Sequence, residues 1–104
     1  MDRANLLARV RELLGKAFGR RLRGVVLYGS EARGEAGPDS DIDLLVLLDG
    51  PVDHQRDFRT CIDTLYDLIL EWERPIHAKP VDFEAYRRGE MPLYRSAQAE
   101  GIPA

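Results

Sequence analysis

Residues 25–48 constrain the fold more than any other part of the chain, because they contain two apolar runs joined by a turn-rich link. Val25–Tyr28 is a short run of β-forming residues that ends at Gly29, which predicts a strand. From Asp41 to Leu48 the side chains alternate, and beyond the aspartates both faces of the alternation are apolar. This pattern is typical of a central strand that other elements cover on two sides.

Two longer segments show helical periodicity. Apolar residues recur at helical spacing over residues 4–18 and again over residues 54–73, which predicts two amphipathic helices. Tyr66 and Trp72 belong to the apolar stripe of the second helix, and we expect both to pack in the core. Cys61 lies in the same stripe and is expected to be a buried packing residue.

The remaining elements are shorter. Ile76–Val81 reads as a third strand, and Pro80 within it indicates an edge strand or a strand end. We expect a short helix to begin at Ser30, a helical turn over residues 83–88 and a last helix over Pro92–Glu100. The predicted order is helix, strand, short helix, strand, helix, strand, helix. It belongs to the α/β (α+β) class, with one small sheet and helices packed on it.

Size and composition limit the classes of protein to consider. With 104 residues and 44% apolar residues, the sequence predicts a single domain over residues 1–104. A net charge of −3 with 32% charged residues is not the basic balance of a general nucleic-acid binder, so no direct nucleic-acid binding is expected. The longest apolar run, Leu44–Leu48, is too short to span a membrane. The lone Cys61 and the absence of a signal-peptide pattern predict a cytoplasmic protein.

Three arginines, Arg20, Arg21 and Arg23, form a basic link after the first helix. One interpretation is a solvated connection that is favourable at the C-terminus of a helix. The other is a patch that attracts phosphate or a partner. The sequence leaves both open.

The two aspartates at the start of the central strand carry the clearest chemistry. Asp41 and Asp43 are two residues apart, so they project from the same face with α-carbons roughly 6.5 Å apart. Mg²⁺ prefers oxygen ligands and is usually held by one or two carboxylates, substrate phosphates and water. Without a cation, like charges this close repel each other. The pair therefore indicates a metal site.

The end of the first strand offers an anion site near these carboxylates. Gly29 has no side chain, so a phosphate can approach its backbone closely. Ser30 supplies a hydroxyl donor and the expected start of a helix, whose free N–H groups favour an anion. Arg33 adds a permanent positive charge. In the alternative interpretation, Gly29 and Ser30 form only a tight turn with a helix cap, and Asp41 caps a loop.

The two blocks Gly29-Ser30-Glu31-Ala32-Arg33-Gly34 and Ser40-Asp41-Ile42-Asp43 together resemble the minimal nucleotidyltransferase (MNT) domain of the DNA polymerase beta-like superfamily. The resemblance covers essentially the whole chain and implies a mixed sheet with a fold like the polymerase beta palm. It implies transfer of a nucleoside monophosphate, AMP from ATP, to a hydroxyl while pyrophosphate leaves. It also implies that Asp41 and Asp43 are the catalytic ligands of Mg²⁺, and that the nucleotide is bound by Gly29, Ser30, Arg33 and Ser40.

The chain departs from that family at the third carboxylate, which active members generally carry on a later strand. Here the alternating face of that strand offers His77 and Lys79. Asp82 has the opposite parity and is expected beyond the strand end. His77 and Lys79 are either ordinary polar residues of an edge strand, or His77 serves as a base with a pKa near neutrality. Whether the site catalyses transfer therefore stays open.

Two functions follow from the resemblance. In the first, the protein is a Mg²⁺-dependent nucleotidyltransferase that modifies a partner protein, as the antitoxin of a HEPN/MNT toxin–antitoxin pair. In the second, it is a weakly active or inactive relative that neutralises a HEPN-type RNase toxin by binding it. A small-molecule transferase of the aminoglycoside type is a third option, which the lack of an acceptor-binding domain disfavours. Homo-oligomerisation is left open.

Overall fold

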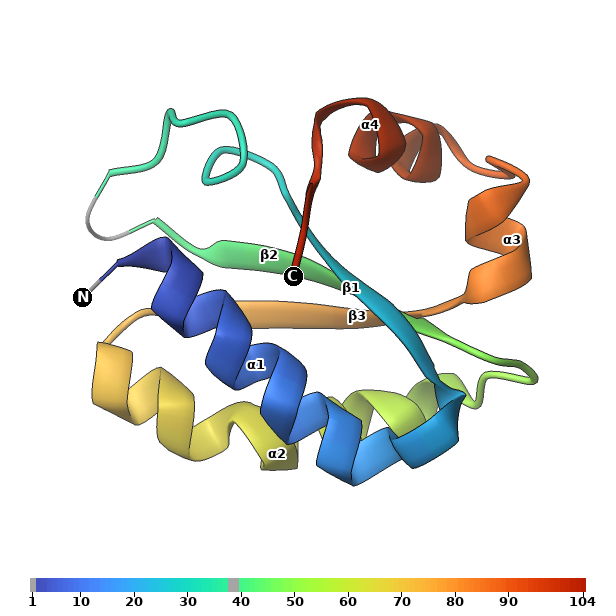
Figure 1. The fold of residues 1–104 in the computed structure, drawn as a ribbon, viewed down its shortest axis with the longest axis horizontal. Helices are drawn as coiled ribbons and strands as arrows, with labels where there is room; N and C mark the ends of the chain where they lie inside the picture. The colour runs from blue at the N-terminus through green and yellow to red at the C-terminus, as the bar shows by residue number, and fades with distance from the viewer. Residues whose placement is uncertain (1, 38–39) are drawn as a thin grey trace.

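The computed structural model describes residues 2–37 and 40–104, and its centre is a mixed four-stranded sheet in the order β3-β2-β1-β4 (Figure 1). β1 (Leu22–Tyr28) pairs antiparallel with β2 (Ile42–Leu48), and β2 pairs in parallel with β3 (Ile76–Asp82). A two-residue strand, β4 (Ile102–Pro103), pairs antiparallel with β1. β2 is therefore a central strand, as the sequence predicts, and β3 is an edge strand, which is the first of the two alternatives that Pro80 leaves open.

Helices lie on both faces of the sheet (Figure 1). α1 (Arg3–Phe18) and α2 (His54–Trp72) cover one face, and α3 (Phe83–Arg87) and α4 (Pro92–Glu100) cover the other. A short 3₁₀ helix, η1 (Gly19–Arg21), joins α1 to β1. None of the helices in the described part of the chain is long and apolar enough to cross a membrane.

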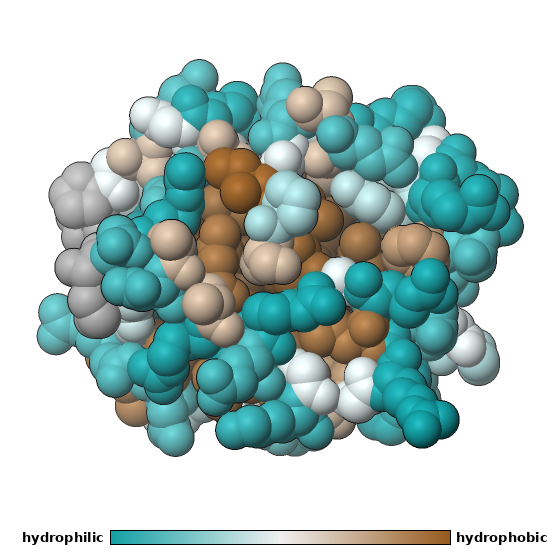
Figure 2. Space-filling model, viewed as in Figure 1, coloured by the Kyte–Doolittle hydropathy of each residue, from teal (hydrophilic) through white to brown (hydrophobic). Residues whose placement is uncertain are grey.

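The core consists of two layers that meet at the central strand. Ile42, Leu44, Val46 and Leu48 face α1 and α2, whereas Leu45 and Leu47 face the side of α3 and α4. All of these side chains are buried, which confirms that β2 is covered on both faces. Figure 2 shows hydrophilic side chains over most of the outer surface in this view, with apolar side chains gathered near the middle of the face.

The structure corrects the predicted order at the first link. Residues 30–34 form a turn and not the short helix that we expect from the sequence. In this turn the Arg33 amide donates to the Gly29 carbonyl at 3.2 Å, and the Glu35 amide donates to the Ser30 carbonyl at 2.9 Å. Gly29 and Gly34 have φ values of +77° and +73°. Left-handed residues at both ends interrupt a right-handed helix, so the segment closes after one turn.

The apolar stripe of α2 is only partly buried, which corrects the expectation for Tyr66. The buried residues of α2 are Asp57, Cys61, Leu65 and Leu68, whereas Tyr66 is 56% exposed. Because the helix has 3.6 residues per turn, a series at four-residue steps drifts away from the buried face. Trp72 packs against the core as predicted. Cys61 is buried as predicted, and burial followed by the nearby Asp57 raises its pKa to about 12.

Two residues of the arginine cluster have partners within the chain. Arg21 donates two hydrogen bonds to the buried carboxylate of Asp57, at 3.0 and 2.9 Å. Arg23 pairs with Asp49 at 2.7 Å, and its guanidinium carbon lies 4.2 Å from the centre of the Phe83 ring. These contacts give Arg21 and Arg23 structural roles that neither interpretation of the cluster includes.

Candidate active site

The two halves of the sequence motif meet where β1 ends and β2 begins. Tyr28, the last residue of β1, is paired in register with Asp43. The next residue, Gly29, lies so close to the same carboxylate that a β-carbon at this position would be 2.8 Å from Asp43 Oδ2. Both this contact and its φ of +77° favour glycine at position 29. The structure thus brings the Gly-Ser turn against the second aspartate.

Asp41, Asp43 and His77 form one polar group beside this turn. Asp43 is paired in register with His77 of β3, and His77 Nε2 lies 2.9 Å from Asp41 Oδ2. Partial burial raises the pKa of Asp43, the neighbouring His77 lowers it, and Asp41 raises it further. Across residues 2–37 and 40–104 there is no group of three or more His, Cys, Asp or Glu side chains arranged to hold a metal ion. The two carboxylates alone still fit the few protein ligands that Mg²⁺ takes beside phosphates and water.

Within residues 2–37 and 40–104, β3 brings no third carboxylate to face this pair. His77 and Lys79 are both exposed on β3. Asp82 is the last residue of β3, so the expectation that it lies past the strand end is wrong; its place in the ladder is opposite Leu48. Five positions along the strand from His77 correspond to about 16 Å. The Asp82 carboxylate instead caps α3, where it accepts hydrogen bonds from the amides of Glu84 and Ala85.

The side chains of Arg33 and Ser40 have partners within the chain. Arg33 Nε donates to Glu35 at 3.2 Å, and Arg33 Nη1 lies 3.9 Å from Glu100. Ser40 Oγ accepts a hydrogen bond from the Gly37 amide at 2.9 Å. Roles for these two residues in nucleotide binding stay predictions.

The model of the nucleotidyltransferase domain family matches residues 6–99. The chain belongs to this family. A comparison with curated protein sequences found no match. Among solved structures, a toxin–antitoxin crystallised with AMP-PNP is 19% identical, with a TM-score of 0.66 over 92% of this chain and 69% of that one. The spectinomycin adenyltransferase AAD(9) from Enterococcus faecialis, solved with ATP and spectinomycin, is 20% identical. It gives a TM-score of 0.57 over 88% of this chain and 37% of that one.

The family match confirms the resemblance seen in the sequence motifs, and the solved structures confirm the fold class. At these identities the structural likeness shows a shared fold. The mixed sheet and the helices on it are therefore those of a nucleotidyltransferase domain, with the Gly-Ser turn and the two aspartates at one end of the sheet.

Sequence reasoning missed Arg74, which joins the two halves of the nucleotidyltransferase motif. Its guanidinium donates to both carboxylate oxygens of Glu31 in the turn, at 3.4 and 3.0 Å. It also donates twice to the carbonyl of Ser40, at 3.1 and 2.9 Å, directly before Asp41. Both charged side chains are only 18% exposed. Arg3 holds the same turn through the Glu31 carbonyl at 3.1 Å. Glu31 lies inside the motif, but nothing in one sequence links it to a residue 43 positions later.

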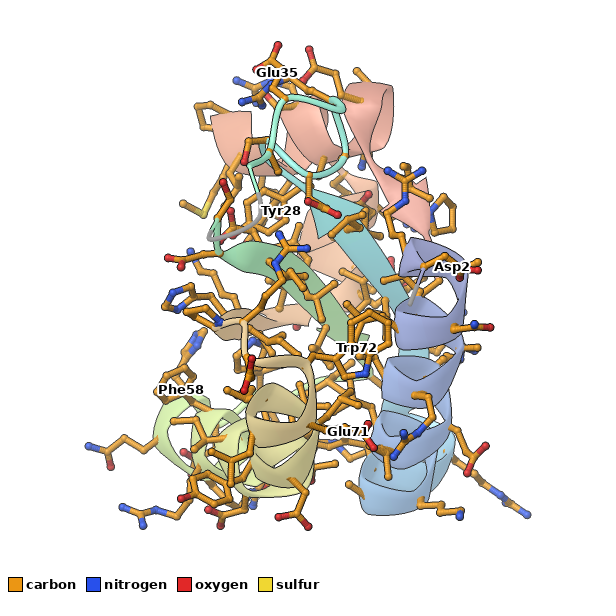
Figure 3. All side chains as sticks on the ribbon, turned by 90° about the vertical axis from the view of Figure 1, so that its left-hand side faces the viewer. Asp2, Tyr28, Glu35, Phe58, Glu71 and Trp72 are labelled. Atoms are coloured by element: carbon orange, nitrogen blue, oxygen red, sulfur yellow. The ribbon has the colours of Figure 1, made fainter. Side chains whose placement is uncertain are left out.

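The site lies at the edge of the molecule rather than in its core. Figure 3 shows Tyr28 at the end of the sheet, below the turn that carries Glu35. Tyr28 is half-buried, and burial followed by the charge of Asp43 raises the pKa of its hydroxyl. Gly29 and Ser30 are also partly accessible. A polyphosphate can therefore reach the turn and the aspartates from solvent.

Proposed function

We propose that this nucleotidyltransferase domain transfers a nucleoside monophosphate, AMP from ATP, to a hydroxyl group of a partner protein, with Mg²⁺ as the cofactor. The observation that carries the proposal is the contact between Gly29 and Asp43. It puts a turn suited to phosphate directly beside a carboxylate suited to a cation.

The chain's own residues supply binding and position. The backbone of Gly29 and the hydroxyl of Ser30 bind the phosphates, and Asp41 and Asp43 hold the cation. When bound, Mg²⁺ neutralises charge on the α-phosphate and on the departing pyrophosphate. The acceptor oxygen attacks the α-phosphorus, the bond to the bridging oxygen breaks, and pyrophosphate leaves. The hydroxyl proton goes to a base, and His77, 2.9 Å from Asp41, has suitable chemistry for this role.

The proposed partner is a HEPN-type RNase toxin, for which this domain serves as the antitoxin. Two observations support this partner. The MNT pattern of the sequence is found in such pairs, and the fold is shared with a toxin–antitoxin solved with AMP-PNP. The modified group is then a hydroxyl of the toxin, such as a tyrosine.

A second function, neutralisation by binding without transfer, is favoured by the position of His77. The family resemblance implies a third carboxylate on this strand, where the chain offers His77 and Lys79 instead, and His77 contacts Asp41 directly. A histidine there is a weaker partner for a divalent cation of the Mg²⁺ type, which prefers oxygen ligands. Without a third carboxylate ligand, the rate of transfer would be lower, while the surface that binds the partner would be unchanged.

Incubation with labelled ATP, Mg²⁺ and the HEPN-type partner distinguishes the two functions. Transfer predicts a covalent AMP adduct on the partner, located by mass spectrometry. Asp43→Asn is expected to lower the rate of adduct formation about 1000-fold, because several kcal/mol of charge stabilisation are lost with the cation.

Asp49→Asn is the matched control, because it removes the same charge beyond the far end of β2, where the Asp49 carboxylate pairs with Arg23. It is expected to transfer at the normal rate. A stable complex without any adduct would favour neutralisation by binding. If Asp41→Asn and Asp43→Asn change neither nucleotide binding nor control of the partner, the assignment of the site is wrong.

A further inference from the structure

The outer side of α2 carries an exposed apolar stripe. Four large apolar side chains follow one another at four-residue steps and are 48%, 45%, 56% and 58% exposed: Phe58, Ile62, Tyr66 and Leu70. Figure 3 places Phe58 on the side of α2 away from α1, whereas Trp72 lies between the two helices. Neighbouring exposed apolar side chains of this size on one helix mark an interaction surface.

The surface at the N-terminal half of the stripe is hollowed. A depression of about 640 Å³ is lined by Phe58 and Ile62 together with polar residues that include Arg56, Arg59 and Asp63. A second depression continues from Phe58 to Lys79 and Pro80 of the edge strand β3. The C-terminal half of the stripe therefore has two projecting side chains, Tyr66 and Leu70. The N-terminal half is a concave surface.

The charges beside the stripe are divided along the helix. Arg56 and Arg59 lie in the N-terminal half, where the Asp57 carboxylate is buried against Arg21. Asp63 lies at the middle of the helix, the C-terminal half carries Asp67 and Glu71, and Glu73 follows at the C-cap, with no basic residue in the last turn. This arrangement is opposite to the one that the helix dipole favours. Within the described part of the chain, Arg59, Asp63, Asp67 and Glu73 take part in no ion pair.

We propose that α2 packs antiparallel against α2 of a second copy of this chain, about a two-fold axis near the middle of the stripe. The proposal does not depend on the proposed function. In this arrangement Phe58 lies opposite Leu70 of the second copy, and Ile62 lies opposite Tyr66. The same patch serves both copies, as an isologous interface requires. The projecting half of each stripe enters the concave half of the other.

The charge pattern is what selects a second copy as the occupant. An antiparallel pair puts the basic half of each helix beside the acidic half of the other, and it also opposes the two helix dipoles. Arg59 then lies opposite position 69 of the second copy, four residues or about one turn from Glu73. The unfavourable distribution of charge in the single chain becomes a complementary one in the dimer, which gives register and direction to an otherwise apolar contact.

Sedimentation velocity of the full chain over a range of concentrations tests this proposal. We expect a dimer with a dissociation constant of about 10 μM, weakened by added salt because exposed charges contribute. Tyr66→Asp is expected to raise the dissociation constant about tenfold or more, since it puts a charge in the centre of the apolar contact. Leu70→Gln is a milder second variant with an effect in the same direction.

Met91→Asp is the matched control, because Met91 is 44% exposed but lies at the start of α4 on the other face of the sheet. It is expected to leave the dimer unchanged. Charge reversal tests the contact between Arg59 and Glu73. Arg59→Glu is expected to weaken the dimer, and adding Glu73→Arg is expected to restore it, because the double variant exchanges the two signs. Circular dichroism confirms that each variant is folded.

Three results would overturn the proposal. The first is a wild-type chain that stays monomeric at about 100 μM, at which a 10 μM dimer is mostly formed. The second is a dimer that Tyr66→Asp and Leu70→Gln leave intact. The third is a monomer whose Tyr66→Asp variant loses binding to a different protein, which would assign the stripe to that protein instead.

Discussion

Two arginine–carboxylate pairs lie at opposite ends of the sheet and serve different purposes. Arg21 binds the buried carboxylate of Asp57 and the carbonyls of Asp49 and Pro51, so it closes the link between β2 and α2. Arg74 binds Glu31 and the carbonyl of Ser40, so it joins the Gly-Ser turn to the start of β2. The same chemistry stabilises the fold at one end and sets the relative position of two functional segments at the other.

The largest effect on stability is expected at the first pair. Arg21→Met leaves the Asp57 carboxylate buried without its main partner, which costs about 3 kcal/mol of unfolding free energy. Urea unfolding measures this loss. Arg56→Met is the matched control, because Arg56 also approaches Asp57, at 3.5 Å, but is largely exposed. Its cost should be about 0.5 kcal/mol or less. Equal costs for the two variants would contradict a special role for Arg21.

At the site end, Gly29→Ala tests the contact between the turn and Asp43. The left-handed φ and the 2.8 Å approach to Asp43 Oδ2 together are expected to cost about 2 kcal/mol and to displace the carboxylate. Gly34→Ala has nearly the same φ, +73°, with no atom within 4 Å of the new β-carbon. Unfolding free energy and ATP affinity are measured for both variants. The difference between the variants therefore gives the effect of the clash with Asp43, apart from the cost of the backbone conformation. ATP binding lost equally in both variants would show that only backbone strain matters.

A smaller effect is expected from Arg74→Met, which releases the turn from the segment before Asp41. We expect about a tenfold loss of ATP affinity, with a cost in stability of about 1 kcal/mol. Calorimetric titration measures the affinity, and Arg74→Lys should recover only part of it because an ammonium cannot reproduce the paired contacts. Arg9→Met breaks the exposed pair with Glu71 and should leave ATP affinity unchanged. An unchanged affinity in Arg74→Met would make Arg74 purely structural.

The smallest effect is the pH dependence of the stabilising pair. Hydrogen bonds from Arg21 hold the pKa of Asp57 below its ordinary value of 3.8. A lowered carboxylate pKa gives stability that is complete above about pH 4 and is lost as the pH falls through the lowered pKa. The urea midpoint should therefore fall more steeply below pH 4 in the wild type than in Arg21→Lys. Parallel curves would contradict this linkage.

The sequence was sufficient for the features that depend on periodicity. It predicted the central position of β2 and the bounds of α4, because burial on one or two faces leaves a direct pattern. It also predicted that the Gly-Ser turn and the aspartates lie close together, since both are adjacent to the ends of neighbouring strands.

Other features depend on geometry that a single sequence does not encode. The turn at residues 30–34 follows from the left-handed conformation of Gly29 and Gly34, which a helix signal does not reveal. β4 has only two residues, so it carries no periodicity. Tyr66 is exposed because its stripe drifts around α2. The Arg74–Glu31 pair spans 43 positions and is visible only in the folded chain.

Paramagnetic broadening by Mn²⁺ tests the central account most directly, because Mn²⁺ accepts the same carboxylate ligands as Mg²⁺. In amide NMR spectra of the chain with a non-hydrolysable ATP analogue, traces of Mn²⁺ should broaden the signals of Gly29, Ser30 and residues 41–43. The signals of Arg21 and Asp57, at the other end of the sheet, should stay sharp. Broadening centred on that other end, or no selective broadening at all, would contradict the assignment of the site.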